Sequence, residues 1–233
     1  MKKFERKIHV IGLNSFKIED FSQEVQELLH QVKNIAVPNS YIHEIKEWVS
    51  MKLITEKNFY ASKSNLDLMN WLKSCDKDVI LISRGDPLWF GIGRILLNKF
   101  SKEELLFYPD KTCLQLAFSR IKKSWHDVKA VSIHGRETNE LIKLLKSKEK
   151  GIAILTDPKN NNLELIRQNL SELNLENYYE FWLCEEIGSK NEKIRSIPHT
   201  EKLPKGISDL NIVILLKKEI NYKIQGIPLF GIS

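Results

Sequence analysis

Hydrophobic residues along this chain occur in two alternating arrangements. Short continuous runs, such as residues 8–13 and 79–82, are followed by stretches in which apolar residues recur every three or four positions. Continuous runs predict buried strands, and the wider spacing predicts one apolar face of a helix. Their alternation is typical of an α/β fold. Strands are predicted at residues 8–13, 79–82, 105–108, 128–133, 152–155, 178–184 and 212–216.

Helical spacing follows most of these runs. The predicted helical faces are Ile18, Phe21, Val25, Leu28, Leu29 and Val32; Ile92, Ile95 and Leu96; Leu114, Ala117, Phe118 and Ile121; Leu141 to Leu145; and Leu163, Ile166, Leu170 and Leu173. Because the strand runs are continuous rather than alternating, helices should cover both faces of each sheet. We therefore expect mostly parallel or mixed sheets flanked by helices.

The length of 233 residues fits two domains of about 110–130 residues each. The charged stretch 146–150, Lys-Ser-Lys-Glu-Lys, is poor in apolar residues and is interpreted as the hinge. We predict an N-terminal α/β domain at residues 1–146, which carries a Gly-Asp-Pro loop. A C-terminal α/β domain should follow at residues 147–233.

Glycine and aspartate gather directly after the predicted strands, where ligands bind in open α/β sheets. The most informative stretch is residues 84–93, Arg-Gly-Asp-Pro-Leu-Trp-Phe-Gly-Ile-Gly. Gly85 allows backbone to approach a ligand closely, and Asp86 presents a carboxylate at a strand end. The same Gly-Asp-Pro sequence is also an ordinary turn signal. It matches neither a phosphate-binding loop nor a dinucleotide fingerprint.

Composition narrows the function classes. The net charge is +6 and the pI is near 9.0, which favours anionic ligands in general. The lysines are spread along the chain among acidic residues, so no nucleic-acid partner is expected. The three cysteines form no CxxC pair, and the histidines show no metal spacing. With no signal peptide and no apolar run of about 20 residues, we expect a cytoplasmic protein without membrane partners.

Taken in order, the strand-end segments resemble the class III, or tetrapyrrole, methyltransferases. Residues 79–97, VILISRGDPLWFGIGRILL, resemble the strand, Gly-Asp-Pro loop and helix of that family. The string GDPLWFGIG is closest to the branch, the CbiE type, that methylates precorrin-6Y and its cobalt counterpart. That branch also forms the N-terminal half of the fused enzyme CobL. Further agreement comes from TCLQLAFSRI at 112–121, VSIHGR at 131–136, LTD at 155–157 and EEIG at 185–188.

The chain departs from the family pattern at several positions. Residues 12–14 read Gly-Leu-Asn where the family usually has Gly-x-Gly, and Arg84 precedes Gly-Asp-Pro where a small residue is usual. Residues 37–38, Val-Pro, stand where a glycine is common, and residues 109–113 replace a Ser-rich turn. Asn tolerates left-handed backbone better than most residues, so the first turn is expected to survive.

The resemblance implies a C-methyltransferase that moves a methyl group from S-adenosylmethionine to carbon 5 of a precorrin in cobalamin biosynthesis. The family binds this cofactor in the cleft between its two domains. By motif position, the implied cofactor-binding residues are Gly12, Leu13, Gly85, Asp86, Trp89, Thr112, Cys113 and Thr156. His134 and Arg136 are the candidates for the substrate's carboxylates, although both residues also suit an exposed turn. No catalytic residue and no metal ligand is assigned.

Two alternatives stay open. One is another class III methyltransferase, for a different precorrin or for diphthine. The other is a non-catalytic corrinoid-binding or interaction subunit, which the altered Gly-x-Gly turn permits. The family implies a homodimer. The apolar stretch 226–233 is unlike the polar ends usual in domains. We expect a fusion to, or cooperation with, a decarboxylating methyltransferase for carbon 15, with a free-standing protein as the alternative.

Overall fold

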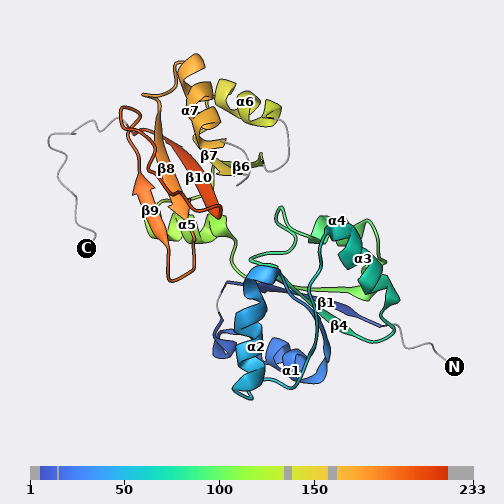
Figure 1. Ribbon diagram of the computed structural model, residues 1–233. Coiled ribbons are helices and arrows are strands. Elements are labelled where there is room, and N and C mark those ends of the chain that lie inside the picture. The colour runs from blue at the N-terminus through green and yellow to red at the C-terminus, as the bar shows by residue number, and fades with distance from the viewer. Residues whose placement is uncertain (1–5, 15, 134–137, 157–161, 220–233) are drawn as a thin grey trace, which may run out of the picture. The chain divides into compact units, whose positions relative to one another are not determined.

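The protein consists of two compact units, one of which is built from two separate stretches of the chain (Figure 1). The computed structural model describes residues 6–14, 16–133, 138–156 and 162–219. The first unit comprises residues 1–123 together with residues 186–192, and the second comprises residues 124–185 and 193–233. The short stretch 186–192 therefore completes the first unit, although it lies between two strands of the second.

The structure places the division between the units earlier than the predicted hinge at 146–150. Strand β6 (Val128–Ser132) pairs in parallel with β7 (Gly151–Leu155), with Val128 opposite Gly151. The two strands are joined through α6 (Asn139–Lys146), so the charged stretch connects a helix to a strand of the same sheet. Its polarity reflects an exposed helix-to-strand turn rather than a boundary between domains.

The first unit is a five-stranded parallel sheet with the strand order β3-β2-β4-β1-β5. Its elements are β1 (Ile8–Leu13), α1 (Gln23–Gln31), β2 (Asn34–Ala36), α2 (Ile42–Ser50), β3 (Asn58–Tyr60), α3 (Asn65–Ser74), β4 (Val79–Arg84), α4 (Gly93–Leu97), β5 (Leu105–Tyr108) and α5 (Cys113–Ile121). Three short 3-10 helices, η1 (Ile18–Asp20), η2 (Asn39–Tyr41) and η3 (Lys102–Glu104), lie in the connections.

Helices cover both faces of this sheet, as the continuous apolar runs predict. Alternate residues of β1 and β4 point to opposite faces. Ile11 and Ile80 pack with α1 and α2, whereas Val10 and Leu81 pack with α3 and α4 (Figure 1). All four side chains are at most 4% exposed.

Helix α1 starts later than its apolar spacing suggests. Ser22 is its N-cap, and the Ser22 hydroxyl accepts a hydrogen bond from the backbone N–H of Val25 at 3.4 Å. Ile18 and Phe21 therefore precede the α-helix, with Ile18 in η1. Both side chains still pack against the same core cluster, so the apolar stripe is continuous although the helix is not.

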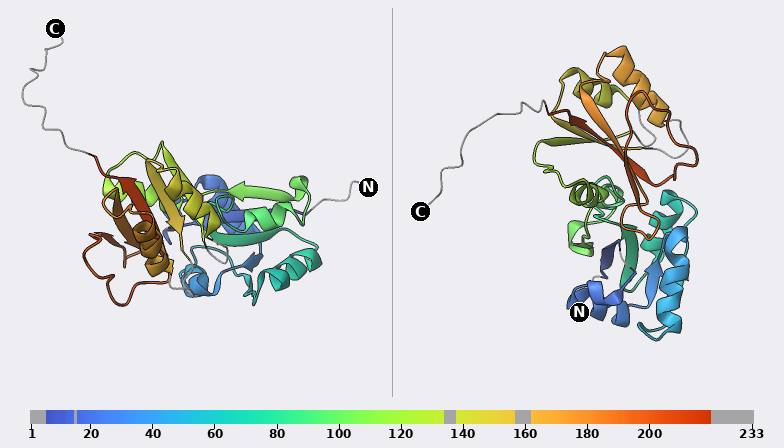
Figure 2. Two further views of the ribbon diagram at one scale, coloured as in Figure 1. Left: turned by 90° about the horizontal axis from the view of Figure 1, so that it is seen from above. Right: turned by 90° about the vertical axis from the view of Figure 1, so that its left-hand side faces the viewer.

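The second unit is a mixed five-stranded sheet with the order β6-β7-β10-β8-β9. Its remaining elements are α7 (Asn162–Glu172), β8 (Tyr179–Glu185), β9 (Lys193–Ser196) and β10 (Asn211–Lys217). Only β6 and β7 are parallel neighbours; the other three pairings are antiparallel. Helices α6 and α7 lie on the same side of the sheet (Figure 2), where their Leu141, Leu145, Ile166 and Leu170 are fully or almost fully buried.

Candidate functional site

The candidate site lies at the carboxyl ends of the neighbouring strands β1 and β4. The last residues of the two strands, Leu13 and Arg84, are opposite each other in the parallel register. Strand β1 leads to α1 on one face of the sheet, and β4 leads to α4 on the other face. Neighbouring strands whose connections leave to opposite faces form a topological switch point, where open α/β sheets bind their ligands.

The backbone segments that end β1 and β4 pack closely against each other. A Cβ atom on Gly12 would lie 1.8 Å from the carbonyl oxygen of Gly85 and 2.7 Å from the backbone nitrogen of Asp110. Gly85 has a φ of +52° and donates its N–H to the carbonyl of Leu13 at 3.3 Å. Its own carbonyl accepts from the Asp110 N–H at 3.2 Å. Both glycines are therefore required for the ends of β1, β4 and β5 to meet.

Asn14 links β1 to the loop after β5. Its backbone N–H donates to Oδ2 of Asp110 at 2.9 Å, and its side-chain amide donates to the carbonyl of Lys111. A Cβ atom on Gly188, within the stretch 186–192, would lie 3.9 Å from the Cβ atom of Asn14. In the Gly-Leu-Asn sequence, the backbone and side chain of Asn14 therefore fix the end of β1 to the loop after β5.

The Gly-Asp-Pro loop after β4 is held by its own hydrogen bonds. Oδ1 of Asp86 accepts from the N–H of Leu88 at 2.8 Å, and the Asp86 carbonyl accepts from Trp89 at 3.1 Å. The carbonyl of Pro87 accepts from the N–H of Gly93 at 2.8 Å. No described residue donates to Oδ2 of Asp86, so this carboxylate oxygen is available at the switch point.

The same loop exposes apolar side chains. Leu88 is 50% exposed and Phe90 is 42% exposed, while Trp89 is half-buried and meets Phe90 edge-to-face at 5.0 Å. Phe90 has a φ of +53°, a conformation that is costly for a bulky residue. Strained backbone of this kind persists where the surrounding structure enforces it, commonly at ligand sites.

Thr112 and Cys113 open the helix that follows β5. The buried Thr112 is the N-cap of α5: its hydroxyl accepts from the Gln115 N–H at 3.1 Å, and Oε1 of Gln115 accepts from the Thr112 N–H at 2.8 Å. This reciprocal capping box satisfies two donors at the helix start. Burial raises the pKa of the Cys113 thiol to about 11. At neutral pH this thiol is therefore protonated and a poor nucleophile.

Arg84 is a site residue that the sequence marked only as a departure from a family pattern. Its exposed guanidinium lies over the ring of Tyr41, with Cζ 5.0 Å from the ring centroid. Nη2 of Arg84 also donates to the hydroxyl of Ser40 at 3.4 Å. A signal that could have found it is an arginine two residues after the apolar run 79–82, at the end of the same strand.

The tetrapyrrole (corrin/porphyrin) methylases match residues 7–202 of this sequence. The chain belongs to this family. A probable cobalt-precorrin-7 C(5)-methyltransferase of Methanocaldococcus jannaschii is 29% identical over 146 residues, which are 61% of this chain and 66% of that protein. The precorrin-6Y C(5,15)-methyltransferase [decarboxylating] of a Sinorhizobium species is 30% identical over 128 residues. Those residues are 54% of this chain and 30% of that protein, so the match spans less than two thirds of either relative.

The fold of the family is also present in solved structures. Uroporphyrin-III C-methyltransferase from Thermus thermophilus, complexed with S-adenosylhomocysteine, matches with a TM-score of 0.64 and 15% identity. The match covers 90% of this chain and 96% of that one. The predicted α/β fold with two helix-flanked sheets is confirmed, as is the recognition of the methylase family from its strand-end segments.

In this tetrapyrrole methylase, seven of the expected cofactor residues lie in strand ends, loops or the start of α5, at the carboxyl ends of β1, β4 and β5. They are Gly12, Leu13, Gly85, Asp86, Trp89, Thr112 and Cys113. The Leu13 side chain is buried in the core, so only its backbone faces the neighbouring loops. Their part in cofactor binding stays a prediction.

Thr156 belongs to the second unit of this methylase and has a structural partner there. Its buried hydroxyl lies 2.7 Å from Oδ1 of Asn211 and 3.2 Å from the Asn211 carbonyl, so it joins the end of β7 to the start of β10. The expected substrate residues His134 and Arg136 lie outside the described residues, as does the terminal stretch 226–233.

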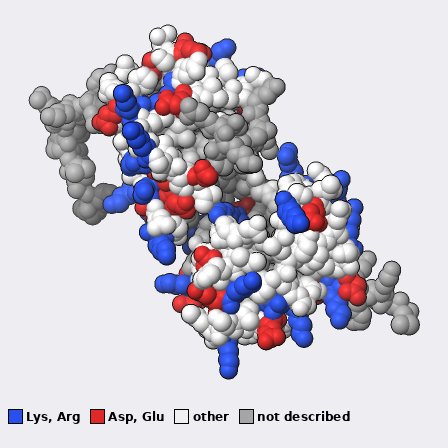
Figure 3. Space-filling view, in the orientation of Figure 1, with Lys and Arg blue, Asp and Glu red and all other residues white. Residues whose placement is uncertain are grey.

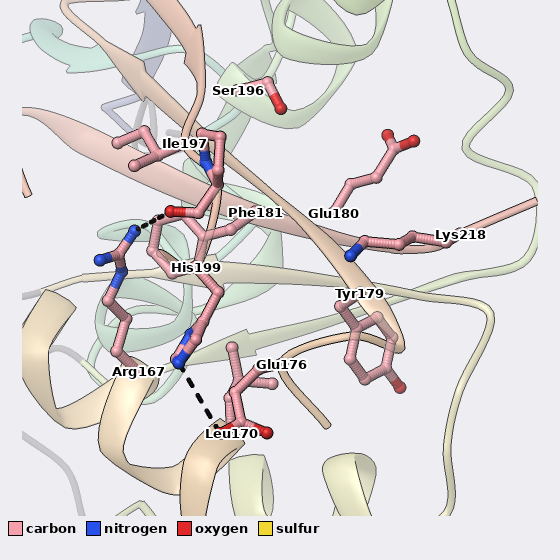
Figure 4. A pocket seen from close by; sticks show the side chains of 11 residues that line it. Arg167, Leu170, Glu176, Tyr179, Glu180, Phe181, Ser196, Ile197, His199 and Lys218 are labelled. Atoms are coloured by element: carbon pink, nitrogen blue, oxygen red, sulfur yellow. Dashed lines mark hydrogen bonds and ion pairs between the residues drawn. The ribbon is translucent and has the colours of Figure 1, made fainter. Parts of the chain in front are cut away.

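A pocket of about 220 Å³ lies at one end of the strands of the second sheet, where β8 begins and β10 ends (Figure 4). Thr156 lies at the opposite end of these strands, beside the start of β10. Two polar side chains of the pocket have partners within the lining. Nη2 of Arg167 donates to the carbonyl of Pro198 at 3.0 Å, and Nε2 of His199 lies 3.7 Å from Oε1 of Glu176. The pocket contains none of the expected site residues.

Charge is dispersed on the face of this methylase that Figure 3 shows. On the face shown in Figure 3, lysine and arginine side chains alternate with acidic ones and form no continuous basic stripe. Within the described ranges, no helix is long and apolar enough to cross a membrane. In the same part of the chain, no group of three His, Cys, Asp or Glu side chains is arranged to hold a metal ion.

Proposed function

We propose that this chain transfers the methyl group of S-adenosylmethionine to carbon 5 of a precorrin in cobalamin biosynthesis. The observation that carries the proposal is the convergence of the β1, β4 and β5 loops at the switch point, with the available carboxylate oxygen of Asp86 among them. Two relatives bear the names of precorrin carbon-5 methyltransferases. A structural neighbour holds S-adenosylhomocysteine, the product form of the cofactor.

The residues at this edge fit the cofactor chemically. S-adenosylmethionine combines cationic groups with an aromatic base. A carboxylate such as Asp86 complements its cations, and the half-buried indole of Trp89 suits either a cation or a stacked base. Loop backbone that is already hydrogen-bonded, at Gly85 and Asp110, needs little reorganisation on binding.

The bound cofactor supplies an electrophilic methyl group on a sulfonium leaving group. The chain's contribution is to hold that methyl carbon in line with the nucleophilic ring carbon of the substrate. Alignment of this kind contributes about 7–11 kcal/mol in favourable cases. The mutual hydrogen bonds of Asn14, Gly85 and Asp110 supply the required rigidity. The neutral thiol of Cys113 is a poor competing nucleophile for the methyl group.

Membership of the methylase family also supports proposals about the substrate contacts and the oligomeric state of this protein. A precorrin carries several acetate and propionate carboxylates, which suit the net positive charge of the chain. We propose Arg136 and His134 as contacts for them. We also propose a homodimer in the cytoplasm that works with a decarboxylating carbon-15 methyltransferase, on the same or a separate polypeptide. Light scattering of the purified protein tests the dimer.

Calorimetric titration with S-adenosylhomocysteine is the first test of the proposed function. We expect saturable binding to the wild-type protein and weaker binding to Asp86→Asn, which keeps the shape of the loop residue but removes its charge. A second assay follows a labelled methyl group from S-adenosylmethionine into cobalt-precorrin-7 and precorrin-6Y. Absence of both binding and transfer in a folded protein would favour the non-catalytic reading.

A further inference from the structure

Among the described residues, Arg84 is held in place by an aromatic ring and a hydroxyl and forms no ion pair. Tyr41, on which its guanidinium rests, meets Phe16 edge-to-face at 5.0 Å, and the carbonyl of Phe16 accepts from the indole N–H of the buried Trp48 at 2.8 Å. A chain of packed aromatic groups therefore connects Arg84 to the core beneath α2. The hydroxyl of Ser40 fixes the guanidinium from a second direction.

No carboxylate in the described part of the protein lies at ion-pair distance from the Arg84 guanidinium. The carboxylates that act electrostatically on Tyr41 are Glu44, Asp110 and Glu186. None of them forms an ion pair with Arg84 in the described ranges, and Asp110 already accepts from the backbone N–H groups of Asn14 and Lys111. A positioned arginine keeps several donors in a planar fork that matches a carboxylate.

The surroundings of Arg84 favour a ligand that is both apolar and anionic. Arg84 immediately precedes the Gly-Asp-Pro loop, which exposes Leu88 and Phe90 to solvent. An exposed guanidinium and exposed apolar groups thus belong to one short stretch, residues 84–90, a combination that suits a ligand whose carboxylates project from a hydrophobic body. The position is also the end of β4 at the switch point, where a bound ligand is expected.

We propose that Arg84 is a carboxylate-binding residue of the ligand site, reading either a side-chain carboxylate of the tetrapyrrole or the amino-acid carboxylate of the cofactor. This inference rests on the proposed function. The aromatic support from Tyr41 explains why an arginine suits the position better than a lysine. A guanidinium both stacks on a ring and forms a bidentate pair, whereas an ammonium group acts as a point charge.

The test compares Arg84→Gln and Arg84→Lys with the wild-type protein and with Arg94→Gln. Arg94 is an exposed arginine of α4 with no ion pair among the described residues, so Arg94→Gln removes the same charge from the same unit. The probes are S-adenosylhomocysteine, 5′-methylthioadenosine, which lacks the amino-acid carboxylate, and uroporphyrin, a stable fluorescent tetrapyrrole polycarboxylate. Melting temperatures establish that each variant is folded.

We expect Arg84→Gln to lower the affinity for one of the carboxylate ligands by about tenfold to a hundredfold, which corresponds to the loss of one charged hydrogen bond. Arg84→Lys should restore part of that affinity, and Arg94→Gln should change it less than about twofold. If Arg84→Gln binds uroporphyrin more weakly but S-adenosylhomocysteine with unchanged affinity, the carboxylate belongs to the substrate. If it binds S-adenosylhomocysteine more weakly but 5′-methylthioadenosine with unchanged affinity, the carboxylate belongs to the cofactor.

Three results would overturn the inference. Wild-type binding that both Arg84 variants retain in full overturns the role of Arg84 and leaves the proposed function standing. An equal loss in Arg94→Gln shows a general effect of charge and also overturns it. If the folded wild-type protein binds none of the probes, the proposed function fails, and the inference fails with it.

Discussion

The carbonyl oxygen of Gly85 occupies the position that a Cβ atom on Gly12 would need. The two glycines lie at the ends of neighbouring strands, and their contact brings the loops of the candidate site together. A glycine in such a loop is commonly explained by its closeness to a ligand. Here the nearest atoms to Gly12 belong to the protein itself, so its first role is to let the strand ends meet.

Gly12→Ala should therefore destabilise the protein strongly. The clash is with backbone on a neighbouring strand, and overpacking of this kind costs about 3 kcal/mol or more. Denaturant unfolding measures the change in the free energy of unfolding. Gly206→Ala is the comparison, because Gly206 has a positive φ, +66°, which Gly12 does not, and no atom lies within 4 Å of its would-be Cβ. It should cost about 1–2 kcal/mol, from backbone strain alone. Equal costs for the two variants would contradict the close contact.

Thr112→Ala should lower the free energy of unfolding by about 0.5–2 kcal/mol, because the N-cap of α5 loses its side-chain acceptor. Thr138 provides the comparison: it is the N-cap of α6 but makes no side-chain capping hydrogen bond. Thr138→Ala should change stability by less than about 0.5 kcal/mol. If cofactor affinity falls while stability is unchanged in Thr112→Ala, the hydroxyl serves the ligand rather than the helix.

Glu185→Ala should destabilise the second unit. Glu185 is 1% exposed, pairs with Arg195, and accepts from the backbone N–H of Ser208 at 2.9 Å. Because the Arg195 side chain is 38% exposed, the variant leaves a partly solvated cation and removes the acceptor of the Ser208 N–H, at a cost of about 1–3 kcal/mol. Asp127→Ala breaks the exposed pair with Lys150 at 2.8 Å and should change the free energy of unfolding much less, because solvent screens exposed pairs. Thermal and denaturant unfolding of both variants measures the difference.

The thiol of Cys113 should resist alkylation at pH 8 in the folded protein. Its pKa is raised to about 11 by burial, so the reactive thiolate is scarce below that pH. Iodoacetamide labelling followed by peptide mass spectrometry reports each cysteine separately. The rate at Cys113 should increase as the pH approaches 11 and should increase at pH 8 when the protein is unfolded. Rapid labelling of the folded protein at pH 8 would indicate an activated thiol instead.

The sequence predicted long, uniformly apolar strands well and short elements poorly. Strands β1, β4, β5, β7 and β10 lie within about one or two residues of their predicted ranges, as is usual for boundaries. Residues 34–74, which form β2, α2, β3 and α3, were not assigned to elements. Strands β2 and β3 have three residues each and α2 buries only Ile45 and Trp48, so the local pattern is weak without the sheet that they join.

The sequence predicted which loops form the candidate site, but it predicted less well what each side chain in them contacts. Switch-point loops can be found from the sequence because glycine and aspartate follow the strands. Whether a hydroxyl faces a ligand or a neighbour depends on tertiary structure, and Thr112 and Thr156 both bond to protein groups. Arg84 could not be evaluated from spacing, because its support comes from Tyr41, which is 43 positions earlier in the chain.

The first unit depends on residues 186–192, which are translated long after the rest of it. Nε of Arg120 donates to Oε1 of Glu192 at 2.8 Å, and Oε2 of Glu192 accepts from the N–H of Gly188 at 2.8 Å. A nascent chain that has released only residues 1–123 from the ribosome therefore lacks these contacts. These contacts can form only after β6, β7 and β8 have been synthesised, so the last segment of the first unit is translated when most of the second sheet already exists.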